Sequence, residues 1–346
     1  MSAQTVTGQT VTGQVHTSQT GTTRAPAGRR TASWFASPPP SAAVEIGAGR
    51  VTAVVLSTVD GAPTVTAQAT ERLPDGLVAP SLTTPNLTEK AAVAAAVQRV
   101  LRAVGVSRGR VAVVIPDGAA KVSVVRFEKV PPKAEDLGQL VRWQVRKSVP
   151  FPIEQSQVSW TPGVTDATGT DYVVTVARQD IVRDYEQAVA AAGVQVGIVD
   201  LATYNLVNLL LAGDAAATAG DWLLVHVTPD ASTMAIVRDG ALLLFRHRPV
   251  EGEGSLSDLG HQTAMYYEDR LGGRGLSRAV IAARDVGPHV LGDLQALGRA
   301  IEQRVGKAIE EIDPRALVRV AAESGIGGER AAIAAPVGVL LRERVR

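Results

Sequence analysis

The chain has 346 residues, enough for two compact lobes or for one large domain with a tail. Hydrophobic residues make up 45% and charged residues 20%, an ordinary globular balance, and the net charge of +1 gives no basic footprint for nucleic acid. The absence of cysteine excludes disulfides, thiolate zinc sites and cysteine nucleophiles.

No segment is apolar over the roughly 20 residues that a membrane-spanning helix needs. The most apolar stretch, 198–213, is interrupted by Asp200, Asn205 and Asn208, and the first forty residues lack the apolar core of a secretory signal. We therefore expect a cytoplasmic protein that reaches a membrane only through a partner.

Residues 1 to about 32 are rich in Thr, Gln, Gly and Ser and contain the direct repeat TVTGQ-TVTGQ. Such a segment buries too little apolar surface to offset the entropy of ordering it, so we predict a disordered tail. Trp34 and Phe35 follow it, just before three prolines. We favour docking of this pair on the folded body over a role as an anchor for a partner or a membrane.

Order is expected to begin at Ala43. Residues 44–73 predict three antiparallel strands with Asp60-Gly61 as a hairpin turn. A helix follows, for which Asn86 and Glu89 have the spacing of a capping box. Residues 111–116 then predict a buried strand.

The second half repeats this order. Residues 222–249 predict three strands with Asp239-Gly240 as the hairpin turn, and a helix over 255–271 and a buried strand over 279–283 follow. A further helix is expected from about 290 to 305. Two copies of strand–strand–strand–helix–strand indicate a duplicated architecture.

An inserted unit, residues 119–193, separates the two copies. Its pattern predicts a strand, a helix, two strands and a helix, which is an α+β subdomain with a small sheet of its own. The predicted elements are the strand 122–127, the helix 134–148, the strands 157–162 and 171–177, and the helix 180–192.

This duplicated order resembles the actin-like ATPase superfamily, and several motifs narrow the likeness to the PilM family of type IV pilus assembly proteins. The stretch VEIGAGRVTAVVL, 44–56, resembles that family's first phosphate loop. Residues 124–155 carry its Arg-containing strand, proline turn, acidic helix start, Trp-containing helix and Pro-Phe-Pro ending, here Arg126, Pro131, Glu135, Trp143 and Pro150-Phe151-Pro152. Residues 174–201 and 335–342 also match, so the likeness covers about 42–346.

The resemblance implies an α/β, actin-like fold of two lobes, with a 1C-type subdomain inserted in the first lobe and the 2B subdomain missing from the second. The second three strands run through VEGEG directly into a helix, which leaves no room for 2B. The expected divisions are a tail 1–41, a first lobe 42–118, the 1C insert 119–193, a return to the first lobe 194–216, a second lobe 217–330 and a closing helix 331–346.

A nucleotide cleft would use Gly47, Ala48 and Gly49 in the first loop, although a plain hairpin turn explains these residues as well. In the second loop the family's Asp-Ile-Gly is replaced by residues 226–230. His226 takes the place of the acid, proline removes a backbone donor, and Asp230 could substitute only after a register shift. We expect His226 to be a half-buried strand residue with a local hydrogen bond.

The turn that would contact adenosine also departs from the family's run of glycines. It reads Arg284-Asp285-Val286-Gly287-Pro288, and we expect Arg284 to face solvent rather than a phosphate. The missing 2B subdomain would leave one side of the cleft open to water, which weakens electrostatic stabilisation of phosphate charge. We predict a vestigial site with no bound cofactor, ATP and magnesium being the alternative.

No catalytic residue is assigned. The five histidines lack the spacing of a zinc site, and no GxSxG or GxxxxGK[ST] motif occurs. The predicted function is a non-enzymatic cytoplasmic scaffold of a type IV pilus or type II secretion-like platform, with self-association left open. The alternatives are an ATP-binding ATPase of the same machine and an actin-like small-molecule kinase.

The resemblance further implies that the cytoplasmic tail of a PilN-like membrane protein binds in a groove between subdomains 1A and 1C. The expected contacts are Arg126, Trp143, Pro150, Phe151 and Pro152. The competing interpretation is that Trp143 and Phe151 complete the core of the subdomain.

Overall fold

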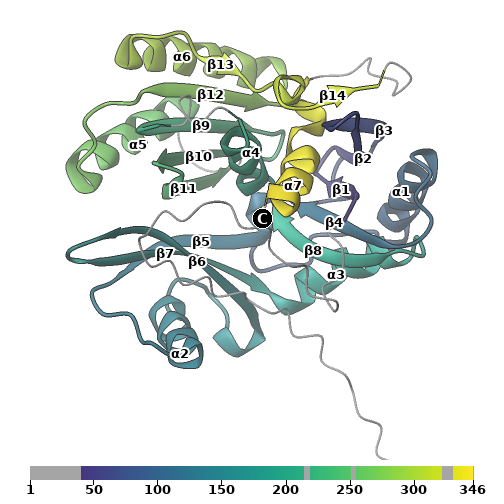
Figure 1. Ribbon diagram of the computed structural model, residues 1–346, viewed down its shortest axis with the longest axis horizontal. Helices are drawn as coiled ribbons and strands as arrows, with labels where there is room; N and C mark the ends of the chain where they lie inside the picture. The colour runs from purple at the N-terminus through teal and green to yellow at the C-terminus, as the bar shows by residue number, and fades with distance from the viewer. Residues whose placement is uncertain (1–39, 214–218, 251–254, 322–329, 346) are drawn as a thin grey trace, which may run out of the picture.

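The computed structural model describes residues 40–213, 219–250, 255–321 and 330–345, which form three sheets and seven α-helices (Figure 1). The predicted tail up to residue 39, with Trp34 and Phe35, lies outside the described residues. None of the described helices is long and apolar enough to cross a membrane.

The first lobe is built on a six-stranded sheet in which β1 is antiparallel to β2 and parallel to β4. The β2–β3 turn has positive φ at both Asp60 and Gly61, the backbone that Asp-Gly favours in a two-residue hairpin. The sheet order is β14-β3-β2-β1-β4-β8, from β1 (Ala42–Ile46), β2 (Arg50–Val59), β3 (Ala62–Arg72), β4 (Arg110–Ile115), β8 (Gln195–Leu201) and β14 (Arg319–Val320).

The second lobe repeats this arrangement. Its β9 is antiparallel to β10 and parallel to β12, and Asp239 and Gly240 again have positive φ at the hairpin turn. The sheet order is β11-β10-β9-β12-β13, from β9 (Asp221–Val227), β10 (Ala231–Arg238), β11 (Ala241–Pro249), β12 (Arg278–Ala283) and β13 (Glu310–Glu311). The duplicated actin-like order predicted from the sequence is therefore confirmed.

A small third sheet, in the order β5-β7-β6, lies below the second lobe in Figure 1. It consists of β5 (Ala120–Phe127), β6 (Ser156–Asp166) and β7 (Gly169–Arg178). Helix α2 (Ala134–Val145) packs one apolar face onto it through Leu137, Val141 and Val145. This is the predicted α+β insert, and α2 ends three residues earlier than the sequence pattern suggested.

The helices form layers around the two large sheets. One face of the first sheet is covered by α1 (Lys90–Ala103) and α3 (Gln179–Ala190), and the outer face of the second by α5 (Leu256–Leu271) and α6 (Pro288–Val305). Between the two sheets lie α4 (Ala202–Leu211) and α7 (Ala334–Val345). They pack so closely that a Cβ at Gly338 would come within 1.8 Å of the Asn205 carbonyl oxygen.

The connection between β11 and α5 in the second lobe is short. Only residues 250–255 connect β11 to α5, so no 2B-type subdomain is inserted there.

The capping box predicted at Asn86 and Glu89 is wrong, because Glu89 makes no side-chain cap. Asn86 is buried and instead donates to the Ser81 and Thr84 carbonyls and accepts a hydrogen bond from Tyr185.

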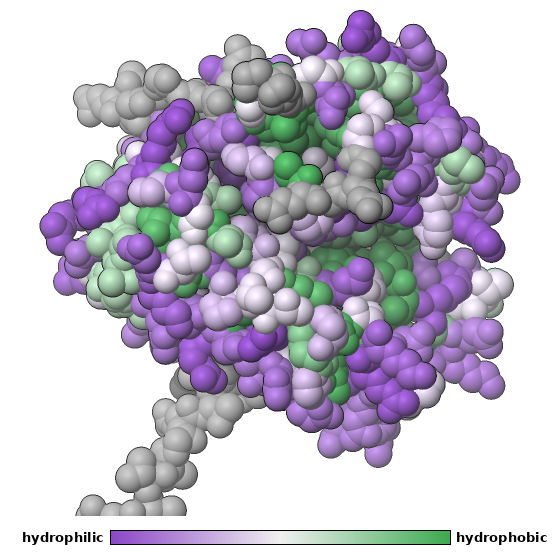
Figure 2. Space-filling model, turned by 180° about the vertical axis from the view of Figure 1, so that it is seen from behind, coloured by the Kyte–Doolittle hydropathy of each residue, from purple (hydrophilic) through white to green (hydrophobic). Residues whose placement is uncertain are grey.

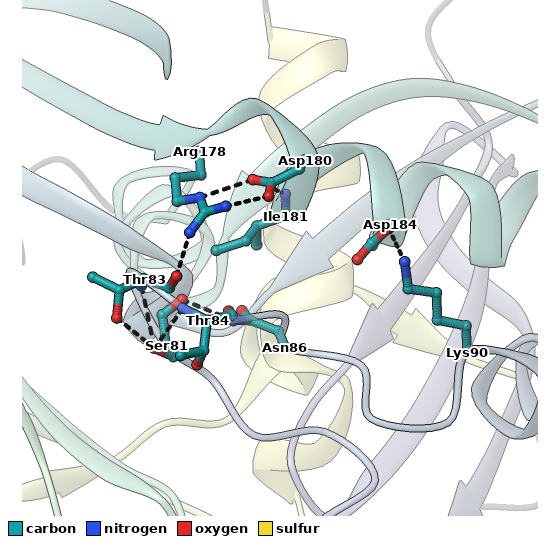
Figure 3. A network of polar contacts seen from close by, with 9 residues as sticks. All are labelled: Ser81, Thr83, Thr84, Asn86, Lys90, Arg178, Asp180, Ile181 and Asp184. Carbon is teal, nitrogen blue, oxygen red and sulfur yellow. Dashed lines mark hydrogen bonds and ion pairs between the residues drawn. The ribbon is translucent and has the colours of Figure 1, made fainter. Parts of the chain in front are cut away.

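Polar contacts join the first lobe to the last strand and the last helix of the insert, β7 and α3 (Figure 3). Arg178, at the end of β7, donates to the Thr83 carbonyl and to Asp180, and Lys90 pairs with Asp184 of α3 at 2.5 Å. Leu82 of the same loop packs against the apolar cluster between α2 and the third sheet. The insert is thus fixed to the first lobe by both polar and apolar contacts.

Candidate functional site

The candidate site is the cleft between the two lobes, where four chain segments meet. They are the β1–β2 turn with residues 47–49, the β9–β10 turn with residues 228–230, the end of β4 with Asp117, and the end of β12 with Arg284 and Asp285. The structure therefore brings Gly47, Ala48, Gly49 and Asp230 to one cavity.

The first loop is a tight turn in which the Gly47 amide donates to the Arg50 carbonyl at 2.9 Å. Neither Gly47 nor Gly49 has positive φ, and a Cβ at Gly49 would meet nothing within 4 Å. The turn itself therefore does not require glycine at these positions.

A buried ion pair crosses the cleft between the lobes. Arg284, from the end of β12, donates through both terminal nitrogens to the carboxylate of Glu45 on β1, with one contact of 2.6 Å. The two side chains are 7% and 4% exposed. Burial acts to lower the pKa of Arg284, but the charge of Glu45 outweighs it and the pKa is raised. The expectation that Arg284 faces solvent is wrong, because the carboxylate offers it a counter-charge inside the protein.

A second ion pair runs in parallel. Arg50 of β2 pairs with Asp285, whose backbone has a φ of 55°. Both pairs join a first-lobe strand to the turn after β12, which is where the family's glycines would admit adenosine. Each cation here is matched by a carboxylate of the protein itself.

Asp117 is the centre of a buried polar cluster that the sequence analysis missed. Its carboxylate accepts hydrogen bonds from the Thr203 amide at 3.0 Å, the Thr203 hydroxyl and the Thr233 hydroxyl at 2.9 Å. His226 Nδ1 lies 2.8 Å from the Thr203 hydroxyl oxygen and 3.4 Å from Asp117. Since the threonine hydroxyl donates to Asp117, His226 must donate from Nδ1.

His247 completes the cluster from β11, with Nδ1 3.0 Å from the Thr233 hydroxyl oxygen. Burial alone would raise the pKa of Asp117, but hydrogen bonding and charge from His226, helped by His247 and Thr203, lower it to about 2. Burial lowers the pKa of His247. The expected local hydrogen bond of His226 is thus present, and its ring is buried rather than half-buried.

These side chains fill the cleft. The remaining cavity measures about 20 Å³, room for about one water molecule, whereas small-molecule sites typically measure at least about 300 Å³. Proline at 229 and the paired Arg284 leave few donors for phosphate. Among the described residues no three histidine, aspartate or glutamate side chains group to hold a metal ion. In this arrangement the residues do not fit a nucleotide with magnesium.

The predicted partner residues lie on two faces of the insert. Arg126 points from β5 toward the second lobe and pairs with Asp166 and, at 2.9 Å, with Asp171. Trp143 lies on α2, across the sheet from Arg126, and is 58% exposed with the Arg146 guanidinium over its ring. Pro150 and Pro152 are exposed, and Phe151 is half-buried against the α2 cluster.

These positions separate the two interpretations of the aromatic residues. Phe151 contributes to the subdomain core, as the competing interpretation holds, whereas Trp143 does not. The structure brings Trp143 and the 150–152 segment to the α2 side of the sheet and leaves Arg126 on the other side.

The sequence and the structure of this chain were compared with those of known proteins. The family model of the type IV pilus assembly protein PilM matches residues 43–269. Among solved structures, a PilM-PilN type IV pilus biogenesis complex has a TM-score of 0.70 at 18% identity and covers 88% of this chain and 98% of that chain. No curated protein matches the sequence.

Two further solved structures align with this chain at lower scores. The ethanolamine utilization protein EutJ from Carboxydothermus hydrogenoformans gives a TM-score of 0.46 at 11% identity, covering 88% of this chain and 90% of that chain. The cytoplasmic domain of EpsL, an inner membrane component of the type II secretion system of Vibrio cholerae, gives 0.47 at 10% identity, covering 88% and 94%.

Proposed function

This chain belongs to the PilM family of type IV pilus assembly proteins, and from that premise we propose that it is a cytoplasmic scaffold of a pilus machine whose interlobe cleft does not hydrolyse ATP. In this role it holds a membrane-protein tail at the inner membrane and needs no nucleotide to join its lobes. A type II secretion-like platform is the related alternative setting.

The buried Glu45–Arg284 ion pair is the main support for the proposal that the cleft does not hydrolyse ATP. A phosphate group needs donors and cations that are free to turn toward it. Here the cation at the mouth of the cleft is already held by a carboxylate that is 4% exposed, and breaking such a pair leaves an uncompensated buried charge. Binding ATP would therefore require opening both interlobe ion pairs.

Isothermal titration and thermal unfolding with ATP and magnesium test this part. A ligand at a hundred times its dissociation constant adds about 2.7 kcal/mol to the free energy of unfolding. We expect no heat of binding and no rise in melting temperature beyond that given by magnesium chloride alone. Nucleotide retained through purification, or a rise specific to ATP, would support the ATPase alternative instead.

The partner part of the proposal is a PilN-like cytoplasmic tail bound at the insert. The similar solved structure is that of a PilM-PilN complex. In this chain, Trp143 has the highest exposed fraction among the exposed large hydrophobic residues of the described chain, and the stacked Arg146 limits its freedom. A large ring that is already partly ordered loses little entropy on binding, which suits a peptide anchor.

A Trp143→Ala variant tests this assignment against Arg142→Ala, a matched change at the next, exposed helix position. The measurement is fluorescence anisotropy of a labelled peptide covering the cytoplasmic tail of a PilN-like protein from the same organism. We expect at least about a tenfold loss of affinity for Trp143→Ala, since hot-spot aromatic residues typically contribute about 2 kcal/mol. Unchanged affinity in a folded Trp143→Ala variant would rule out Trp143 as the anchor.

A further inference from the structure

A second hollow of the molecule lies between the insert and the second lobe, on the face of the third sheet that α2 does not cover. It measures about 640 Å³ and is walled by β5, β6 and β7 on one side and by β11 and the C-terminal end of α5 on the other. The space-filling view from behind shows apolar side chains inside the hollow between the two halves of the molecule (Figure 2). We call it the insert groove.

Residues of the insert and of the second lobe line opposite walls of the insert groove. In the second-lobe wall, the Phe245 ring packs edge-on against Tyr204 with centroids 5.5 Å apart. Val124 and Arg126 of β5 face Leu243 of β11 across the hollow. A hollow of about 640 Å³ between two walls has room for several residues of an extended peptide.

The charges in the insert groove are unbalanced. Arg126 is matched by Asp166 and Asp171, and Arg238 by Asp221 at 2.6 Å. Arg246 and Arg270 have no acidic partner within ion-pair distance in the described part of the chain. The guanidinium of Arg246 is held 5.6 Å from the centroid of the Tyr266 ring, which presents the cation at the rim with little freedom.

Apolar surface accompanies these cations. Tyr266 is 43% exposed, and its neighbour Met265, also on α5, is 48% exposed. In addition, β11 is the last strand of its sheet, and the insert strands β5 and β6 lie against it without pairing with it. Cations and apolar contacts side by side match one kind of ligand.

We propose that the insert groove binds an extended peptide in which acidic and apolar residues alternate, supplied by a second protein of the assembly. Alternation suits the site because successive residues of an extended chain point to opposite sides, so carboxylates can reach Arg246 and Arg270 on the wall of β11 and α5. The apolar side chains between them then face Val124 and Val164 on the wall formed by the insert. The chain's own N-terminal segment is a poor occupant, because residues 1–39 contain three arginines and no acidic residue. This site is separate from Trp143, which lies across the third sheet.

The probe is a labelled ten-residue peptide in which glutamate alternates with leucine and valine, compared with the same peptide carrying lysine for glutamate. Anisotropy is measured with the full chain, with Arg246→Glu/Arg270→Glu, and with Arg102→Glu/Arg142→Glu, a double reversal at exposed arginines on α1 and α2. We expect the glutamate peptide to bind the full chain, at least about tenfold loss in the groove variant, no change in the control, and weaker binding at higher salt.

Three results would overturn the proposal: no binding of the glutamate peptide, equal binding of both peptides, or binding unaffected by the groove variant. Sedimentation velocity adds a further arm. A dimer that dissociates in Arg246→Glu/Arg270→Glu would show that the occupant is a second copy of the chain. If the folding of the groove variant is in doubt, Tyr266→Ala, at an exposed position, gives the same test through the apolar contact, with at least a severalfold loss expected.

Discussion

The interlobe cleft and the insert groove both contain arginine–carboxylate ion pairs, but the cleft is filled and the groove is open. In the interlobe cleft, arginine and carboxylate are 7% and 4% exposed and the remaining cavity measures about 20 Å³. In the insert groove, Arg126 pairs with Asp171 at 36% and 14% exposure, and about 640 Å³ stays open. The buried Arg284–Glu45 pair joins the two lobes, whereas the exposed Arg126–Asp171 pair lies within the insert and lines one wall of the groove.

The difference lies in what the arginines of each hollow contact. In the interlobe cleft, Arg284 and Arg50 are both matched by carboxylates of the protein itself. The insert groove keeps two arginines without acidic partners in the described chain, and it is the surface with binding capacity left. The predictions below test this contrast in order of expected size.

The largest effect is expected for Arg284→Met, which leaves the Glu45 carboxylate buried without its counter-charge. Breaking one partner of a buried pair costs about 3–5 kcal/mol. The free energy of unfolding, measured with urea, should fall by that amount. In Glu45→Gln/Arg284→Met, where no charge remains buried, most of the loss should return, and a double-mutant cycle gives the coupling. A loss below about 1 kcal/mol in the single variant would mean that the cleft is hydrated.

A smaller effect, with a pH signature, is expected for Asp117→Asn. The folded-state pKa of about 2 is below the ordinary 3.8, so the ionised carboxylate stabilises the fold above pH 3.8. That stabilisation, about 2 kcal/mol, is lost as the pH falls from 3.8 toward 2. Asp117→Asn should remove this part of the acid dependence. Thr233→Val deletes one hydrogen bond but keeps the carboxylate, and should preserve it. An unchanged acid profile in Asp117→Asn would contradict the assignment.

His247 should give a milder dependence nearer neutral pH. Burial lowers its folded-state pKa below 6.5, so the unfolded chain takes up the proton first and stability falls as the pH drops below about 6.5. One such group changes the free energy of unfolding by at most about 1.4 kcal/mol per pH unit. His247→Gln should flatten the slope between pH 7 and 5, and His261→Gln, at an exposed position of α5, should not. Equal slopes in the two variants would disprove this role.

The parts of this molecule that could be predicted from its sequence depend on local chemistry. Asp60-Gly61 and Asp239-Gly240 specify their turns because only a few residue types accept positive φ, and alternation of apolar residues specifies the strands around them. The helix start at Glu89 could not be predicted in the same way. Asn86 has the right spacing for a cap, but it is used by Tyr185, 99 residues away along the chain.

The contacts in the interlobe cleft could not be predicted either, because their partners lie far apart in the sequence. Arg284 is buried only because Glu45 meets it from 239 residues away, and no pattern around Arg284 reports that partner. Asp117 had one usable signal, its place after Pro116 at the C-terminal end of a buried strand, where sites of α/β folds gather. Its partners Thr203 and Thr233 come from two other elements, and their convergence depends on how the lobes pack.

The smallest effect on stability is expected for Arg126→Met, and it tests the contrast most directly. Like Arg284, Arg126 touches carboxylates through its terminal nitrogens, but water competes for the contacts of its 36% exposed side chain. Exposed pairs gain little because solvent screens the charges and ordering two long side chains costs entropy. Urea unfolding of Arg126→Met should therefore differ little from the unsubstituted chain, by a small fraction of the loss in Arg284→Met. The same substitution frees Asp166 and Asp171 within the groove, so the glutamate peptide should bind more weakly. A large loss of stability with unchanged peptide binding would contradict the proposal, because it would show that Arg126 stabilises the fold and does not affect peptide binding in the insert groove.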